Sequence, residues 1–320
     1  MAIVAGIDEA GLGPMLGPLV VSASVFSVPD ACLDESLWKL LAGAVCRRAS
    51  KKSSRLAIAD SKTMYVREGL VHLERGVLGM LRQLGPLPAS LAALLSQLAP
   101  TGSASLAEHP WYAGVDLPLP RAADAVDVNL RANGLRTALE RRQVRLEALR
   151  CEPVLEGEFN RLLAATRNKA VAHFGVTSRL IAYVFERFAD RGLTRIVVDH
   201  QGGRVRHVQE LGKLFPHARI RILHESADRS EYFLQDGPRA AEIGFWVKGE
   251  DVALPCALAS MLSKYVRELF MELFNGWWAA RVPDLKPTAG YYSDGRRFLQ
   301  QIAAAIVAAG VDRQLLVRAR

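Results

Sequence analysis

Short apolar runs alternate with amphipathic stretches along the chain. Residues 3–8 and 19–26 are apolar and flank a turn rich in glycine and proline, which predicts a pair of antiparallel strands. Similar short runs predict further strands at 143–150, 195–199, 218–224 and 242–248. Helical periodicity predicts helices at 34–47, 65–84, 132–142, 158–172, 176–191, 203–215, 254–275 and 294–309. Alternating strands and helices are typical of an α/β layer fold.

One stretch interrupts this pattern. Residues 86–130 carry many of the prolines and the segment TGSAS, and they show no sustained period. Such composition indicates a variable segment between regular elements. We therefore expect a single domain over residues 1–320 that is interrupted by an insert at about 86–140.

The composition of the chain suggests a class of binding partner and a cellular location. Half of the 320 residues are hydrophobic, which is ample for a buried core, and the formal charge is +8. Excess Lys and Arg suit a polyanion such as nucleic acid, although solubility alone is an equally good explanation of the charge. The four cysteines lack zinc-ligand spacing, and the N-terminus does not resemble a signal peptide. No apolar run is long enough for a membrane span, so we expect a cytoplasmic protein.

Carboxylates follow three of the predicted strands. Asp8 and Glu9 end the first strand, Asp199 ends another, and Glu250 and Asp251 come shortly after a third. Because sites in α/β sheets are usually built where strands end, we expect these acids to converge. Oxygen ligands without a matching His/Cys set select Mg²⁺ or Mn²⁺. Two such ions roughly 3.5–4 Å apart would stabilise the attacking and leaving oxygens of a phosphodiester hydrolysis.

The adjacent pair Asp8 and Glu9 poses a geometric difficulty. Neighbours on a regular strand point to opposite faces, so both reach one cluster only if the strand ends or distorts there. The turn that begins at Gly11 makes such an ending plausible, while a simple capping role for the pair is the alternative. Gly11 and Gly13 also leave backbone N–H groups open to a sugar-phosphate chain, although an ordinary tight turn needs the same residues.

Several motifs, in the order in which they occur, resemble one known family. Residues 6–25, GIDEAGLGPMLGPLVVSASV, are similar to the opening of the type 2 ribonuclease H family, which includes ribonucleases HII and HIII. The later matches are ADSKTM at 59–64, RCEPVLEGEFN at 150–160, VVD at 197–199, KGEDVALPCALASMLSKYVRE at 248–268 and GYYSDGRRFL at 290–299. An ordered series of motifs from residue 6 to about 300 is more specific than any one of them.

The resemblance implies a ribonuclease H-like fold, with a mixed five-stranded sheet flanked by helices. It implies two Mg²⁺ or Mn²⁺ ions and a substrate that is an RNA–DNA hybrid or DNA with embedded ribonucleotides. The catalytic and metal-binding residues carried over by position are Asp8, Glu9, Asp199 and Glu250, with Asp251 as a substitute for the last. The nucleic-acid-binding residues carried over are Gly11, Leu12 and Gly13 at ribose 2′-hydroxyls, Lys62, Ser260 and Lys264 near phosphates, and Tyr291 at an RNA–DNA junction.

The chain also departs from the family at several positions. Glu250 stands where ribonuclease HII has Asp, Leu12 replaces a basic residue, and His200 replaces a Gly. His200 suits either a proton shuttle or a structural role. Two other functions therefore stay open: a catalytically impaired hybrid-binding protein, and a nuclease of the same fold that acts on branched or single-stranded DNA. The sequence points to no obligate protein partner.

Overall fold

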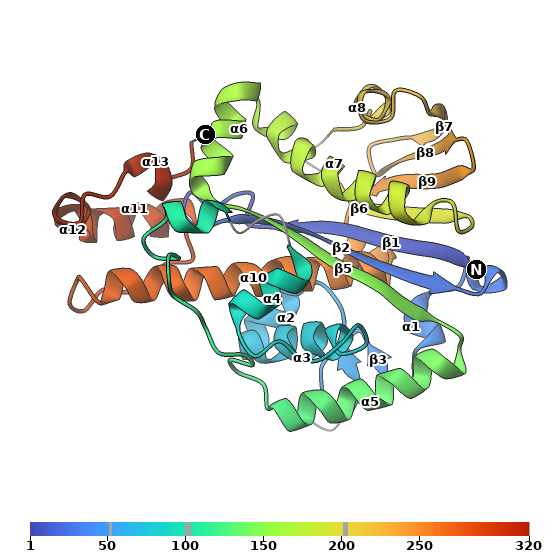
Figure 1. The fold of residues 1–320 in the computed structure, drawn as a ribbon, viewed down its shortest axis with the longest axis horizontal. Coiled ribbons are helices and arrows are strands. Elements are labelled where there is room, and N and C mark those ends of the chain that lie inside the picture. Colours follow the sequence, from blue (N-terminus) through green and yellow to red (C-terminus); the bar gives the residue numbers. More distant parts are fainter. Residues whose placement is uncertain (51–52, 100–103, 201–203, 320) are drawn as a thin grey trace.

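The computed structural model describes residues 1–50, 53–99, 104–200 and 204–319 (Figure 1). Its centre is one mixed sheet of seven strands in the order β5-β2-β1-β6-β9-β8-β7. These strands are β1 (Ala2–Ala10), β2 (Leu19–Val28), β5 (Arg145–Val154), β6 (Thr194–Asp199), β7 (Arg219–Glu225), β8 (Arg229–Asp236) and β9 (Arg239–Trp246). A separate two-stranded sheet joins β3 (Val45–Cys46) to β4 (Leu56–Ala57).

Strand direction brings the ends of β1, β6 and β9 to one edge of the sheet. These three strands run parallel to one another. The strands outside them, β2 and β5 on one side and β8 and β7 on the other, pair antiparallel. The predicted hairpin of the first two strands is confirmed, as is the convergence of parallel strand ends on which a site can be built.

Helices cover both faces of the sheet. Helix α7 (Lys169–Phe188) lies over one face and the long helix α10 (Leu254–Ala279) over the other (Figure 1). Helix α10 lies very close to β1, since a Cβ on Gly6 would be 2.0 Å from the backbone nitrogen of Cys256. The other helices are α1 (Leu37–Leu40), α2 (Ser61–Glu68), α3 (Leu70–Leu81), α4 (Leu91–Leu98), α5 (Ala125–Arg141), α6 (Glu156–Thr166), α8 (Val208–Leu214), α9 (Gly249–Val252), α11 (Tyr292–Gln301), α12 (Ala303–Ala308) and α13 (Arg313–Leu316).

The sheet has two more strands than the five that the resemblance implied. Strands β7 and β8 form a hairpin beyond β9, and β8 has no counterpart among the strands predicted from the sequence. Its residues alternate between the core and partial exposure, with Tyr232 and Leu234 fully buried. Its apolar run covers only residues 232–234 and is flanked by Glu231 and Gln235, so it is shorter than the runs that identify the other strands.

Helix boundaries differ from the prediction at several places, which include the starts of α5 and α7, the break between α11 and α12, and the three that follow. Residues 34–47 contain only the short α1, followed by turns and β3. Residues 65–84 fall into two helices, because Gly69 has a φ of +63° and separates α2 from α3. The helix predicted at 203–215 begins at Val208 as α8, and its predicted first residue lies outside the described ranges.

The segment at about 86–140 is part of the main core. It forms α4 and α5, and Leu94, Trp111 and Leu135 pack in the same apolar cluster as α10. Residues 100–103 within it lie outside the described ranges. Its status as an insert stays a prediction, but its packing shows that it is not a loosely attached loop.

Among the described residues, no helix combines the length and the apolar character that crossing a membrane requires. This finding agrees with the absence of a long apolar run in the sequence.

Candidate metal centre

Three of the predicted acids meet where β6 ends. Ile7 of β1 is paired with Val198 of β6, so the next residues of the two strands, Asp8 and Asp199, lie side by side. The structure brings carboxylate oxygens of Asp8, Glu9 and Asp199 within 4.8 Å of one another. The sequence-based expectation that acids from separate strands converge is therefore met for these three.

Asp8 and Glu9 reach the cluster from opposite faces of the sheet. Strand β1 continues to Ala10 and pairs with β2 without a register shift, so the expected ending or distortion at these two residues does not occur. Asp8 leaves on the α10 side, where it accepts a hydrogen bond from Ser260. Glu9 leaves on the α7 side, beside His173. The neighbouring strand stops at Asp199 instead, and the open end of β6 lets both side chains meet.

Glu250 adjoins this cluster through the tight start of α9. The backbone N–H of Gly249 donates to Asp199 Oδ1 at 2.8 Å. A Cβ on Gly249 would lie 2.9 Å from Cys256 Sγ and 3.3 Å from Asp199 Cα, so the close approach favours glycine. The charge of Glu250 contributes to the raised pKa of Asp199, which places it on the cluster side of α9. Asp251 is exposed, and its carbonyl accepts a hydrogen bond from Arg47.

The electrostatics of the cluster favour a bound cation. Burial raises the pKa of Asp8 well above its usual range, and the charges of Glu9 and Asp199 add to the effect. Burial, with the charges of Glu250 and Glu9, raises the pKa of Asp199 to about 7. Glu9 Oε2 and Glu250 Oε2 are buried without a hydrogen-bond partner among the described residues. Crowded carboxylates with unsatisfied oxygens fit a hard divalent ion such as Mg²⁺ or Mn²⁺.

The two glycines of the turn after β1, Gly11 and Gly13, have different surroundings. Gly11 has a φ of +90°, and a Cβ there would lie 2.5 Å from Arg267 Nε. Leu12 packs against the core on the α7 side of the sheet. Gly13 is exposed, with open space around its Cβ position. Gly11 is thus required by the fold, while the backbone at Gly13 is accessible to a ligand.

Tyr291 lies next to this turn. The carbonyl of Gly290 accepts hydrogen bonds from the backbone nitrogens of Met15 at 2.8 Å and Leu16 at 3.3 Å. Tyr291 directly precedes α11 as its N-cap residue and is 53% exposed. A nucleic acid that contacts Gly13 would therefore have an aromatic side chain close by.

The remaining predicted contact residues differ in their availability. Ser260 is buried and shares hydrogen bonds with Ser61 and Asp8, which suits orientation of the carboxylate rather than contact with phosphate. Lys264 donates to Glu268 at 2.5 Å and lies over the Tyr65 ring, so its charge is already partnered. Lys62 is exposed at the start of α2 and can face a phosphate.

The structure also adds residues that the sequence did not single out. His173 of α7 lies against Glu9, and the sequence offered no signal for it beyond a histidine on an apolar helix face. Arg47 stacks 3.7 Å from the centre of the Trp38 ring. It lines a cavity of about 450 Å³ together with Glu250, which places a guanidinium beside the acids. His200, which the sequence had already singled out, follows Asp199 and has its ring 6.5 Å from that of His207.

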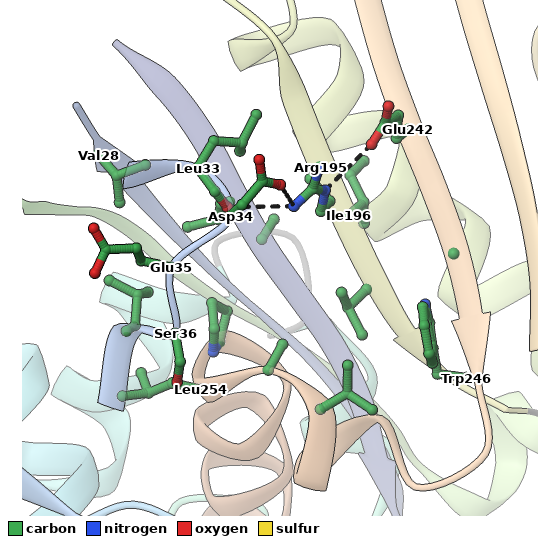
Figure 2. A pocket seen from close by; sticks show the side chains of 18 of the residues that line it. Val28, Leu33, Asp34, Glu35, Ser36, Arg195, Ile196, Glu242, Trp246 and Leu254 are labelled. Atoms are coloured by element: carbon green, nitrogen blue, oxygen red, sulfur yellow. Dashed lines mark hydrogen bonds and ion pairs between the residues drawn. The ribbon is translucent and has the colours of Figure 1, made fainter. Parts of the chain in front are cut away.

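A second cavity, of about 520 Å³, lies on the α10 side of the sheet (Figure 2). Arg195 lies between Asp34 and Glu242, at 3.1 and 3.2 Å from their oxygens, so its charge is neutralised there. Trp246 forms one wall and is the register partner of Asp199. None of the four predicted catalytic acids lines this cavity.

Comparison with known proteins gives similarity at the level of solved structures. No family model and no curated protein matches the chain. The chain is similar to RNase HII of the PCNA:RNase HII complex from Archaeoglobus fulgidus, with 16% identity and a TM-score of 0.44 over 99% of this chain and 94% of that one. It is also similar to Bst-RNase HIII in complex with Mn²⁺, with 14% identity and a TM-score of 0.45 over 99% of this chain and 66% of that one.

A third similar structure is ribonuclease H2 from Pyrococcus horikoshii OT3. It has 14% identity and a TM-score of 0.40 over 98% of this chain and 92% of that one. At such identities and TM-scores the matches establish no activity for this chain.

Proposed function

We propose that this protein is a metal-dependent endonuclease of the type 2 ribonuclease H kind. It hydrolyses the RNA strand of RNA–DNA hybrids, or ribonucleotides embedded in DNA, with Mg²⁺ or Mn²⁺. The observation that carries the proposal is the meeting of Asp8, Glu9 and Asp199 at the end of β6, with Glu250 beside them.

The side chains of the cluster have separate tasks in this proposal. Asp8, Asp199 and Glu250 hold the cations, and Glu9 binds a cation or orients the water. Bound divalent ions would supply an activated water and neutralise the departing oxygen. The Ser260 hydroxyl orients Asp8, and the Gly249 N–H orients Asp199. Both contacts fix a carboxylate before substrate arrives, which is what a preorganised site requires.

Substrate recognition belongs to the turn after β1 and its neighbours. The open backbone at Gly13 would contact a ribose 2′-hydroxyl, Tyr291 would pack against the sugar-phosphate chain, and Lys62 would face a phosphate. With a net charge of +8, binding should weaken steeply as salt is added, because phosphate contacts release counterions. We also place the protein in the reducing cytoplasm, where its four free cysteines would stay reduced.

Cleavage of three end-labelled duplexes tests the function. They are an RNA–DNA hybrid, DNA with a single ribonucleotide, and all-DNA, each with Mg²⁺ or Mn²⁺. We expect the wild type to cut the duplexes that contain RNA, and Asp8→Asn to lose this activity by a factor of about 10³ or more. Asp251→Asn is the matched control, because this exposed acid neighbours Glu250 without facing the cluster.

The same panel separates the alternatives. Hybrid binding without cleavage under any condition would identify a binding protein. Cutting of branched or single-stranded DNA with no preference for RNA would identify a different nuclease. Equal losses in Asp8→Asn and Asp251→Asn would mean that the acids were assigned wrongly.

A further inference from the structure

A buried histidine lies close to the unpartnered oxygen of Glu9. His173 lies on α7 with its side chain 2% exposed, and its Nε2 is 3.6 Å from Glu9 Oε2. Neither of these two atoms has a hydrogen-bond partner among the described residues. An unsatisfied donor and an unsatisfied acceptor therefore face each other across a buried gap slightly longer than a hydrogen bond.

The two aspartates of the cluster have their orientation fixed by neighbours. Asp8 accepts hydrogen bonds from Ser260 and from the backbone nitrogen of Glu9, and Asp199 accepts one from Gly249. Glu9 has a longer side chain than either aspartate and leaves β1 on the opposite face from Asp8. Unless a partner restrains it, its carboxylate has several rotamers that point away from the shared oxygens. Within the described ranges, the basic side chain that lies against that carboxylate is His173.

We infer that His173 is a positioning residue that donates its Nε2–H to Glu9 Oε2 and keeps the Glu9 carboxylate turned toward Asp8 and Asp199. This inference rests on the proposed function, since it assigns the cation-binding role to Glu9. The other oxygen of Glu9 is then free to bind a cation. Hydrogen bonds of this kind are often long before ligand binds and shorten afterwards. His173 touches neither substrate nor cation and acts only through Glu9.

Other histidines near the cluster have different surroundings. The ring of His207 stacks on Phe245 with centroids 3.7 Å apart, and its further ring contacts are with Phe174, His200 and Tyr232. His207 therefore offers a matched control, because it is a buried imidazole of the same layer that packs on aromatic rings and not on a carboxylate.

Direct measurement of cation binding tests this role. Mn²⁺ binding to the substrate-free protein is followed by electron paramagnetic resonance for the wild type, His173→Leu, His173→Gln and His207→Leu. We expect His173→Leu to weaken Mn²⁺ binding by about tenfold or more, as removal of a ligand's hydrogen-bond partner commonly does. His173→Gln keeps a side-chain N–H donor and should recover most of the affinity, while His207→Leu should retain wild-type affinity.

A double-mutant cycle distinguishes positioning from general packing. In the Glu9→Gln background, His173→Leu should cause little further loss of Mn²⁺ affinity, because its effect passes through the Glu9 carboxylate. In cleavage assays, His173→Leu should lower kcat at limiting cation and leave the KM for the hybrid unchanged. Equal Mn²⁺ affinity in folded His173→Leu and wild type would overturn the inference. So would additive losses in the cycle.

The two proposals fail in different ways. If the wild type cuts no duplex but binds Mn²⁺ in a His173-dependent manner, the proposed function is wrong and the positioning role stands. If the wild type cuts hybrids and all His173 variants bind Mn²⁺ equally, only the positioning role is wrong. Circular dichroism establishes that each variant is folded, and His173→Gln carries the test if His173→Leu is not.

Discussion

At the scale of single residues, the negative charges of the acids in the cluster repel one another when no cation is bound. The pKa of Asp199 is raised to about 7 by burial and by the charges of Glu250 and Glu9. An unfolded chain ionises the same group near pH 4. Between about pH 4 and pH 7, Asp199 therefore keeps its proton in the folded state and has lost it in the unfolded state. Ionisation of Asp199 therefore costs the fold least below about pH 4. As the pH rises from there to about 7, it lowers the free energy of unfolding increasingly.

Removing this charge should stabilise the cation-free protein. Asp199→Asn should raise the free energy of unfolding at pH 8 by about 1–3 kcal/mol, while cleavage is lost. Urea unfolding in the presence of a chelator measures this difference, which should shrink strongly at pH 4.5. If wild type and variant were equally stable at pH 8, the crowding of charges would not be a cost to the fold.

The two glycines of the turn should respond differently to the same substitution. Gly11→Ala places a methyl group against Arg267 and on a backbone with positive φ, so it should destabilise the protein by about 1–3 kcal/mol. Gly13→Ala meets open space and should change Tm by no more than about 2 °C. If the Gly13 backbone contacts ribose, Gly13→Ala should nevertheless raise the KM for the hybrid. Thermal melts and cleavage kinetics of both variants check this pair, and an unchanged KM in Gly13→Ala would remove that contact.

At the scale of elements, the burial of a strand or helix determines whether it could be predicted from the sequence. Strands β1 and β6 are buried on both faces, so their continuous apolar runs and the acids at their ends could be predicted. Strand β8 has only a short apolar run between polar and charged residues, and the break between α2 and α3 depends on one glycine. His173 could not be predicted as a neighbour of Glu9, because their contact depends on how α7 crosses the sheet.

One buried acid joins the segment at about 86–140 to the rest of the fold. Glu74 of α3 accepts hydrogen bonds from the backbone nitrogens of Arg121, Ala122 and Ala123 and from the Tyr265 hydroxyl, at 2.6 to 2.7 Å. The side chain is fully buried. The residues before α5 are thereby tied to both α3 and α10.

Loss of this acid should weaken the whole fold. Glu74→Ala removes a buried acceptor of four hydrogen bonds and should lower the free energy of unfolding by about 3 kcal/mol or more. Glu272→Ala is the control, since Glu272 also contacts Arg121 but at the surface, and it should cost less than about 1 kcal/mol. Urea denaturation followed by tryptophan fluorescence compares them. Similar losses in the two variants would contradict a central role for Glu74.

At the scale of the whole molecule, distant segments close around the turn after β1. Arg318 is 3% exposed and donates hydrogen bonds to the carbonyls of Gly11 and Pro14. Glu156 of α6 accepts one from the backbone nitrogen of Gly17 at 2.9 Å. The proposed ribose-reading turn is thus held by side chains from the middle and the far end of the sequence.

This arrangement predicts that a substitution at residue 318 weakens both the fold and the binding of substrate. Arg318→Leu leaves the two carbonyls without their donor and should cost about 2–4 kcal/mol of stability. It should also raise the KM for the hybrid, because Gly13 lies between the released carbonyls. Arg313→Leu removes the same charge from the exposed start of α13 and should change neither quantity. Unfolding and cleavage measurements on both variants test this, and an Arg318→Leu protein with wild-type KM would contradict it.

The hydrogen bond between Gly11 and Arg318 also joins two residues that are synthesised at different times. The two residues are 307 positions apart, so the ribosome makes the turn long before it makes the side chain that holds it. Until residue 318 has been added, the nascent chain has the acids of β1 but no clamp on the turn beside them. In the proposed function this turn recognises ribose, and the chain is synthesised next to ribosomal RNA. The proposed recognition surface therefore stays incomplete until Arg318 has been added to the chain.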